Sequence, residues 1–293
     1  MRSHFRPTPN AEPIAASVSK PTLRSHLLMS NTAIACALSA ATAMVTGVCS
    51  GQIAYDSANN PVYSGGWSAG QNGGFGFGAW SFNGTDATPA GTYQGMTSSS
   101  SLGTAWTLFT HSTSSGLANA GRSINGGLQA GQTFETIFQN PTAYHFYRGF
   151  DMLFTSGPDN NPPGANAASL RLSVFQYGGN NWNINDTGSV GTGYSSSITG
   201  AAGVKLDLTL TSATSYTLTM TPLNGGAVYS HSGTLAGPVD YVDYRLWDGA
   251  SGGPNDVANN FEISSMAVNV PEPSTLALIG LGSAGLLFLR RRK

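Results

Sequence analysis

Residues 205–221 read KLDLTLTSATSYTLTMT and contain two short segments in which apolar and polar side chains alternate. The apolar positions are Leu206, Leu208 and Leu210 in the first segment, and Tyr216, Leu218 and Met220 in the second. A period of two is typical of a β-strand with one buried face. The polar link Thr211–Ser215 is short enough to join the two strands directly. The stretch therefore predicts a β-hairpin.

The same alternation recurs along the chain and predicts an all-β fold. One face of Phe146–Phe154 is apolar apart from Arg148. Further candidate strands are Trp106–Thr110, Thr133–Gln139, Ser169–Tyr177, Val228–Gly233, Tyr241–Trp247 and Phe261–Val268. Turn signals separate them at residues 125–127, 157–159, 178–180 and 224–226. No amphipathic stretch of helical length occurs between residues 52 and 269, so we expect an antiparallel β-sandwich or jelly roll.

Two polar stretches interrupt these strands. Gly157–Ala168 contains three prolines and three asparagines, and we interpret it as a long loop within one domain. The tract Thr97–Ser101 is predicted to be another loop.

Charge excludes one class of partner. Charged residues make up 9% of the chain, and residues 52–269 hold five basic residues against twelve acidic ones. A body with an excess of about seven negative charges has no basic patch to neutralise phosphates, so nucleic-acid binding is not expected.

The N-terminus has the pattern of an export signal. Basic residues precede an apolar, small-residue segment, Thr32–Val48, which predicts a secretory signal helix. Small residues at Cys49 and Gly51 allow cleavage before Gln52, and cleavage one residue earlier is the alternative. Met29 is an alternative start, and lipidation of Cys49 is disfavoured because Val48 precedes it. Both cysteines, Cys36 and Cys49, lie in the segment to be removed, so the mature body has neither a disulfide nor a thiolate metal site.

The C-terminus has the pattern of a membrane anchor. Leu276–Leu289 is a largely apolar run of 14 residues, followed by the basic cluster Arg290, Arg291, Arg292 and Lys293. At ~1.5 Å per residue a helix of this length covers about 21 Å, which is short for a ~30 Å hydrocarbon core. We expect a short transmembrane helix whose basic cluster stays cytoplasmic, which places the body outside.

The order of these features resembles a known sorting signal. Val270, Pro271, Glu272 and Pro273 are followed by the apolar run and the terminal basic cluster. This arrangement resembles the PEP-CTERM sorting signal. The two prolines disfavour helix and keep Glu272 in an extended strip that a protease can read. We therefore divide the chain into a signal region (1–51), a β-sandwich body (52–269) and a sorting tail (270–293).

The resemblance implies a partner and a route. PEP-CTERM tails are thought to be recognised by an exosortase, a membrane cysteine protease of Gram-negative bacteria that make exopolysaccharide. It implies a transient anchor in the inner membrane, cleavage near Pro-Glu-Pro, and delivery to the cell surface or the medium. The body, in the segments 54–80 and 255–261, also resembles the concanavalin A-like jelly rolls found in PEP-CTERM proteins.

Motifs for catalysis are weak. Glutamate occurs in the body only as Glu135 and Glu262, whereas glycoside hydrolysis needs two carboxylates flanking one bond. Asp151, Asp207 and Asp243 lie in alternating segments, and we expect them to face solvent.

Other motifs also favour a structural interpretation. His111, His145 and His231 lack metal-binding spacing, which favours hydrogen-bonded surface or edge residues. The Gly-x-Ser-x-Gly matches at 66–70 and 249–253 have no helix after them and are expected to be loops, and the glycine-rich segment 74–79 is expected to be β-structure rather than a nucleotide fingerprint.

Two features leave a binding role open. Asp248, Asn255 and Asp256 belong to a flexible, oxygen-rich loop that is a candidate Ca²⁺ site, with a self-bonded turn as the alternative. Trp182 lies among asparagines and is the candidate exposed platform for a sugar ring, while Trp80, Trp106 and Trp247 are expected in the core. The sequence thus favours a non-enzymatic surface or matrix protein associated with exopolysaccharide. A carbohydrate-binding, lectin-like module is the alternative, and a hydrolase is least favoured.

Overall fold

The computed structural model describes residues 50–82, 92–99, 101–110, 116–140, 148–158, 168–177, 181–186, 193–199, 201–248 and 259–271. Every described residue belongs to one compact unit of the chain. The predicted signal helix and transmembrane helix lie outside the described ranges. Within those ranges, no helix is long and apolar enough to span a membrane.

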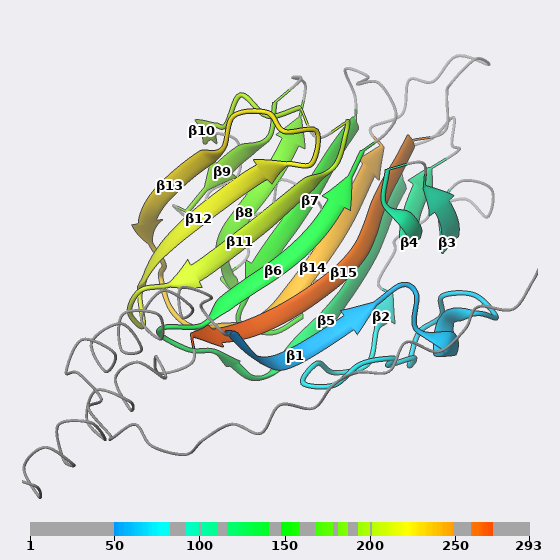
Figure 1. Ribbon diagram of the computed structural model, residues 1–293, viewed down its shortest axis with the longest axis horizontal. Helices are drawn as coiled ribbons and strands as arrows, with labels where there is room; N and C mark the ends of the chain where they lie inside the picture. The colour runs from blue at the N-terminus through cyan, green and yellow to red at the C-terminus, as the bar shows by residue number, and fades with distance from the viewer. Residues whose placement is uncertain are drawn as a thin grey trace, which may run out of the picture. The chain divides into compact units, whose positions relative to one another are not determined.

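The described residues form antiparallel strands in two stacked sheets (Figure 1). The strands are β1 (Ser50–Ser57), β2 (Ser81–Phe82), β3 (Thr92–Ser99), β4 (Gly103–Thr110), β5 (Gly116–Leu128), β6 (Thr133–Gln139), β7 (Arg148–Thr155), β8 (Leu170–Tyr177), β9 (Asn183–Asn185), β10 (Tyr194–Ser195), β11 (Val204–Leu210), β12 (Ser215–Pro222), β13 (Tyr229–Thr234), β14 (Val239–Asp248) and β15 (Asn259–Pro271). A single turn of 3₁₀ helix, Pro61–Tyr63, follows β1.

The larger sheet has eight strands in the order β13-β12-β11-β6-β15-β4-β3, with β1 paired to β15 beside this row. The smaller has seven strands in the order β10-β9-β8-β7-β14-β5-β2. The predicted antiparallel β-sandwich is confirmed.

The predicted hairpin is confirmed as β11 and β12. Leu208 lies opposite Leu218 in the register, and buried and half-buried residues alternate along both strands. The buried leucines enter the core between the sheets, while Lys205 and Asp207 face outward and form an ion pair of 3.2 Å. Local alternation decides this element because each strand has one face in the core and the other toward solvent.

Three regions differ from the sequence predictions. Thr97–Ser99, predicted as loop, ends β3, where cross-strand pairing with β4 overrides the weak local signal. The turn predicted at 125–127 is a bulge inside β5, where Gly126 and Gly127 have φ of 83° and 67°. Strand β5 escaped prediction because the buried positions in its first half are Ala118, Ala120 and a charged residue, Arg122, and large apolar residues join the core only at Ile124 and Leu128.

Arg122 is an arginine inside the sandwich core, with 0% of its surface exposed. Its Nη1 donates to Oδ2 of Asp56 on β1 at 2.5 Å, and its other donors reach the carbonyl of Gly78 and Oδ1 of Asn72. The guanidinium also lies over the ring of Trp80, with Cζ 4.7 Å from the centroid. A buried charge is tolerated only when it is paired and its donors are satisfied, and both conditions hold here.

Tyr63 completes this network. Its hydroxyl donates to Oδ2 of Asp56 at 2.5 Å and accepts from the Nε1 of Trp80 at 3.1 Å. Burial, and then the hydrogen bond to Asp56, raises the pKa of Tyr63 to about 12. The phenol therefore stays protonated and keeps donating, which joins the 3₁₀ turn to the ion pair.

The buried ion pair is expected to dominate stability in this region. Asp56→Ala should lower the free energy of unfolding by about 3–5 kcal/mol, because it leaves the Arg122 charge buried without a partner. The matched control is Lys205→Ala, which removes partly exposed ion pairs with Glu135 and Asp207 and should cost about 0–1 kcal/mol. Chemical denaturation of the purified proteins measures both. Equal losses in the two variants would contradict the role given to Arg122.

Candidate functional site

The outward face of the seven-stranded sheet carries a row of polar side chains, which we call the polar row: Asn119 on β5, Asp243 and Arg245 on β14, and Asp151 on β7. In the register, Arg245 lies between Asn119 and Asp151. Oδ2 of Asp243 accepts from Nδ2 of Asn119 at 2.9 Å and from Nε of Arg245 at 3.0 Å, and Nη2 of Arg245 lies 3.0 Å from the same oxygen. The polar row is thus a hydrogen-bonded network on one face of the sheet.

The polar row is buried, which the sequence did not predict. Asp243 is 1% exposed and Asp151 is 3% exposed, so the expectation that they face solvent is wrong for both. Asp207, on the outer face of the other sheet, is half-buried. Alternation assigns a residue to a face, but whether that face is covered depends on distant parts of the chain.

The central carboxylate of the polar row, Asp243, is paired with a cation, Arg245. A general acid or base must be able to exchange its proton with a substrate. Oδ2 of Asp243 instead accepts hydrogen bonds from Asn119 and from Arg245, and the Arg245 guanidinium is its ion-pair partner. This arrangement favours a structural ion pair over a catalytic carboxylate. The two glutamates of the body lie on different strands, where Glu135 contacts Lys205 and Glu262 accepts from Gln139.

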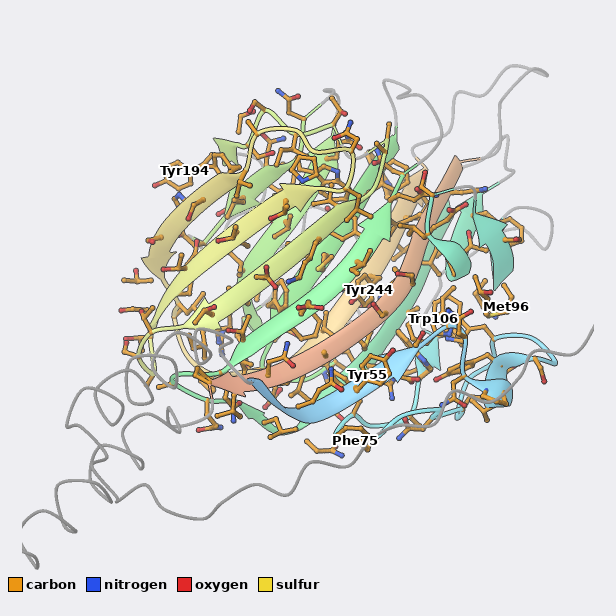
Figure 2. The ribbon with its side chains drawn as sticks, in the orientation of Figure 1. Tyr55, Phe75, Met96, Trp106, Tyr194 and Tyr244 are labelled. Carbon is orange, nitrogen blue, oxygen red and sulfur yellow. The ribbon has the colours of Figure 1, made fainter. Side chains whose placement is uncertain are left out.

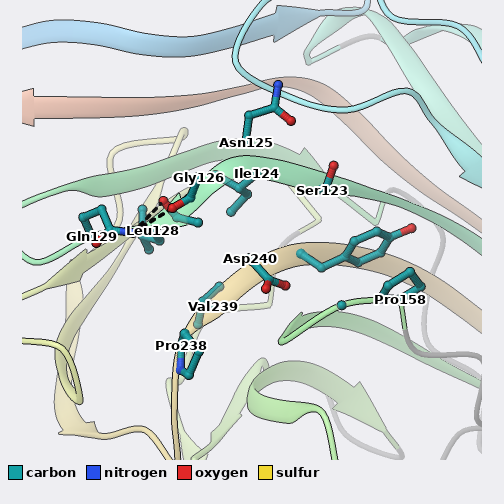
Figure 3. A pocket seen from close by; sticks show the side chains of 13 residues that line it. Ser123, Ile124, Asn125, Gly126, Leu128, Gln129, Pro158, Pro238, Val239 and Asp240 are labelled. Carbon is teal, nitrogen blue, oxygen red and sulfur yellow. Dashed lines mark hydrogen bonds between the residues drawn. The ribbon is translucent and has the colours of Figure 1, made fainter.

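A pocket of about 610 Å³ opens where the β5 bulge meets the start of β14 (Figure 3). Its lining includes Ser123, Asn125, Pro158 and Asp240. Gln129 stabilises the bulge, because its side-chain amide donates to the carbonyl of Gly126 at 2.7 Å. The volume falls within the range of ~300–1,000 Å³ usual for small-ligand sites.

The aromatic residue at this pocket offers little surface to a ligand. Tyr241 packs over Gly121, where an added Cβ would lie 2.5 Å from Cε1 of the ring. Burial, and then the Asp243 charge, raises the pKa of Tyr241 to about 12. The pocket therefore presents polar groups from Ser123, Asn125 and Asp240 but no open aromatic face.

An exposed aromatic side chain lies at the lateral edge of the sandwich. Tyr194 on β10 is 52% exposed, and Figure 2 shows it at the edge occupied by β13 and β10. Its ring is stacked on His231 of β13, with centroids 4.2 Å apart and planes inclined by 33°. One side of the Tyr194 ring is thus supported by the imidazole. We call Asp186, Tyr194, Tyr216, Tyr229 and His231 the edge cluster.

Polar groups surround this aromatic pair. The hydroxyl of Tyr216 donates to Oδ2 of Asp186 at 3.0 Å, and Nε2 of His231 lies 3.7 Å from the same oxygen. Burial and the Asp186 charge raise the pKa of Tyr216, so its hydroxyl remains a donor. Gly233 makes room for this contact, because a Cβ there would lie 2.1 Å from Oδ2 of Asp186. The edge cluster combines a supported, exposed ring with a carboxylate and tyrosine hydroxyls.

The predicted platform at Trp182 is wrong. Trp182 is 0% exposed and packs against Phe138, Phe150 and Phe261 in the core, with its ring centroid 4.9 Å from that of Phe138. Its asparagine neighbours misled the sequence interpretation, because Asn183 and Asn185 point to the opposite side of β9. Trp80 and Trp106 lie in the core as predicted, whereas Trp247 is half-buried on the outer face of β14.

The candidate Ca²⁺ loop is largely outside the described residues. Asn255 and Asp256 lie there, and so does the side chain of Asp248, although its backbone ends β14. Elsewhere in the described ranges, no three His, Cys, Asp or Glu side chains gather as a metal site would require. Ca²⁺ binding stays a prediction. His111 and His145 are likewise outside, while His231 lies on edge strand β13, in agreement with its predicted place.

The candidate sorting motif begins inside the sandwich. Strand β15 continues through Val270 to Pro271, two residues beyond the predicted end of the body, and it pairs with Gly51 and Ser50 of β1. Glu272, Pro273, the apolar run and the basic cluster lie outside the described residues.

Comparison with known families agrees with this C-terminal pattern, since the PEP-CTERM protein-sorting motif matches residues 269–293. The chain ends in a PEP-CTERM sorting motif. The resemblance inferred from Val270–Pro273 and the following segments is thereby confirmed. No curated protein matches the sequence.

Several solved structures are similar to the body. Lectin II from Ulex europaeus is 11% identical, with a TM-score of 0.40 over 65% of this chain and 92% of that one. A legume lectin-like domain from Entamoeba histolytica is 10% identical, with a TM-score of 0.40 over 64% and 88%. A carbohydrate esterase from Shiga toxin-encoding bacteriophage phi24B is 16% identical, with a TM-score of 0.41 over 66% and 90%. At these scores the likenesses carry no conclusion about ligand or activity.

Stability measurements can check that Trp182 is buried and Tyr194 is exposed. Trp182→Ala should cost about 3–5 kcal/mol of unfolding free energy because it leaves a cavity in the core. Tyr194→Ala removes an exposed ring and should change stability by about 0.5 kcal/mol or less. Thermal or chemical unfolding of the two variants measures the contrast. A mild effect at Trp182 together with a large one at Tyr194 would overturn this assignment.

Proposed function

We propose that the protein is an exported, non-enzymatic surface or extracellular-matrix protein that is sorted through its PEP-CTERM tail and associates with exopolysaccharide. The observation that carries the proposal is the sorting motif at 269–293, joined without a linker to the last strand of a β-sandwich. The partner implied by the motif is an exosortase-type membrane protease. The precursor is anchored in the inner membrane through Leu276–Leu289 and Arg290–Lys293.

The body suits a role outside the cytoplasm. It has no cysteine after Cys49, and it is stabilised by a continuous aromatic and aliphatic core together with the Arg122–Asp56 ion pair. A cut beyond Pro271 leaves every described strand intact. The non-enzymatic part of the proposal is supported by Asp243, whose Oδ2 is held by Asn119 and Arg245.

Carbohydrate binding is the second candidate function, and the edge cluster favours it. Sugar sites combine an aromatic surface with a few fixed polar groups, and tyrosine supplies a large rigid surface at low entropic cost. Tyr194 offers such a surface, with Asp186 beside it as an acceptor for hydroxyl groups. The edge cluster replaces Trp182 as the candidate sugar platform. Dependence on Ca²⁺ through Asp248, Asn255 and Asp256 belongs to the same candidate function.

Sorting is tested by replacing Pro271, Glu272 and Pro273 with alanine in the full chain, expressed in its exosortase-containing host. We expect the membrane-bound precursor to accumulate and the processed form to disappear, because the protease-readable strip is lost. Immunoblots of membrane, surface and medium fractions measure this. Lys205→Ala is the control and should be processed like the wild type. Normal processing of the triple variant would refute the proposed route.

Carbohydrate binding is tested with the processed protein and the exopolysaccharide of the host, first with Ca²⁺ and then with a chelator. Tyr194→Ala should weaken binding about fivefold, the effect of losing about 1 kcal/mol of aromatic contact. Asn125→Ala, at the β5 pocket, is the matched control and should bind like the wild type. An effect of Asn125→Ala alone would move the site to the pocket. No binding in either condition would reject the second candidate function.

A further inference from the structure

The edge cluster lies where both sheets end. Among the described strands, β13 is the last of the eight-stranded sheet and β10 the last of the seven-stranded sheet, and both lie at the same lateral edge (Figure 1). Tyr194 lies opposite Ile184 of β9, and His231 lies opposite Leu218 of β12. Ile184 and Leu218 are buried in the core, and residues directly opposite each other in an antiparallel pair share a face. Tyr194 and His231 therefore face each other from the two sheets.

Asp186 reaches the same place from the end of β9. It follows Ile184 by two residues, so it shares a face with Tyr194. Its Oδ2 accepts the hydrogen bond of Tyr216, and Gly233 leaves room for this oxygen. Its Oδ1 accepts no hydrogen bond from the described residues, and 12% of the side chain is exposed. The carboxylate is thus held in a fixed, mostly covered position from which it still reaches solvent.

No lysine or arginine in the described part of the chain pairs with Asp186. The buried Asp56, by contrast, has Arg122 as its ion-pair partner. The basic side chain next to Asp186 is His231, whose Nε2 lies 3.7 Å from Oδ2 and has no hydrogen-bond partner among the described residues. A covered carboxylate is costly unless a cation or several donors stabilise it. The edge cluster therefore has a place for a cation that its own side chains do not fill.

The surroundings of Asp186 favour an ammonium group over a metal ion. Tyrosine rings attract cations that lie within about 6 Å of their faces, and Tyr194 has one open face beside the carboxylate. Ca²⁺ needs about six to eight oxygen ligands. The edge cluster holds one carboxylate, and no three His, Cys, Asp or Glu side chains gather in the described ranges. An organic cation fits this arrangement better than a metal does.

The charge of the body favours the same kind of ligand. Residues 52–269 hold five basic residues against twelve acidic ones. A negatively charged surface attracts a cationic polymer and repels one that is built from uronic acids. A polysaccharide with unacetylated amino sugars is cationic, and its rings can also stack on an exposed tyrosine. Local and overall charge therefore agree.

We propose that the edge cluster binds a polysaccharide unit that carries a free amino group, with Asp186 as the partner of the ammonium and Tyr194 against the sugar ring. The inference rests on the second candidate function and deepens it. An ammonium group donates a charge-assisted hydrogen bond to a carboxylate, which is stronger than a bond between neutral groups. N-acetylation removes the charge, so an acetylated unit leaves Asp186 without a cation. The edge cluster thus distinguishes amino sugars from their N-acetylated forms.

The experiment compares two oligomers that differ only at the nitrogen. The full chain, purified in detergent, is titrated calorimetrically at neutral pH with a glucosamine oligomer and with the same oligomer after N-acetylation. We expect the wild type to bind the glucosamine oligomer about tenfold more tightly, the effect of one charge-assisted hydrogen bond. Asp186→Asn keeps the shape of the side chain and should bind both oligomers equally. The matched control, Asp240→Asn at the β5 pocket, should keep the wild-type preference.

Two further variants separate the charge from the stacking. Tyr194→Ala should weaken binding of both oligomers by the same factor, because the ring contacts the sugar whatever its nitrogen carries. Tyr216→Phe removes the hydroxyl that positions Asp186 and should reduce the preference about threefold. The melting temperature of each variant reports folding, and Tyr216→Phe takes the place of Asp186→Asn if the latter does not fold.

The outcomes separate this inference from the second candidate function. Equal affinity of the wild type for both oligomers would overturn the inference, and so would a preference that persists in Asp186→Asn. Competition by an oligolysine peptide as strong as that by the glucosamine oligomer would also overturn it, because the site would then recognise any polycation. Binding of the host exopolysaccharide but of neither oligomer would reject the amino-sugar ligand alone. Absence of binding to all three carbohydrates would reject the second candidate function itself.

Discussion

One buried guanidinium organises the N-terminal part of this sandwich. Arg122 projects from β5 of the seven-stranded sheet and pairs with Asp56 on β1 of the eight-stranded sheet, so a single charge contact joins the two layers. The remaining donors of Arg122 need acceptors, and the chain from Tyr63 to Trp80 supplies them through Asn72 and Gly78. Phe77 and Trp80 of this segment lie against the guanidinium. Tyr63, Trp67 and Trp80 meet Trp106 of β4 edge-to-face or tilted. The glycine-rich segment from Tyr63 to Trp80 is held in place by these hydrogen bonds, because a buried charge is costly unless its donors are satisfied.

The same principle separates structural from functional polar groups elsewhere. On the seven-stranded sheet, Arg245 and Asn119 both contact Oδ2 of the buried Asp243, which gives these side chains the character of a fixed network. At the lateral edge, Tyr194 is open to solvent, although its neighbours Tyr216 and Asp186 are tied together. An exposed ring supported by a fixed polar network is pre-organised for contact with a partner. The edge cluster therefore has an exposed surface that a sugar could contact, whereas the polar row is buried and structural.

The first and last strands of the body, β1 and β15, pair with each other, and β15 continues into the sorting motif. Strand β15 runs into the first residues of the sorting motif, and β1 pairs with residues 265–271 on one side of it. The pairs of β1 from Gln52 onward and the Asp56–Arg122 contact do not involve the residues before Gln52.

The sequence by itself determined the features that depend on local pattern. The period of two at 205–221 specified β11 and β12, because one face of each strand is buried and the other is not. The tail at 269–293 was recognisable because its function resides in a linear segment that a protease and a membrane can read. Only the tertiary structure decided which side chains are covered. Trp182 lies among asparagines yet is buried, and Tyr194 lies in an unremarkable polar stretch yet is exposed. Arg122 in the core, Asp151 and Asp243 on a covered face, and the pairing of Gly51 with Val270 are likewise long-range outcomes. Burial and pairing of this kind depend on residues far away in the chain, and no local pattern records them.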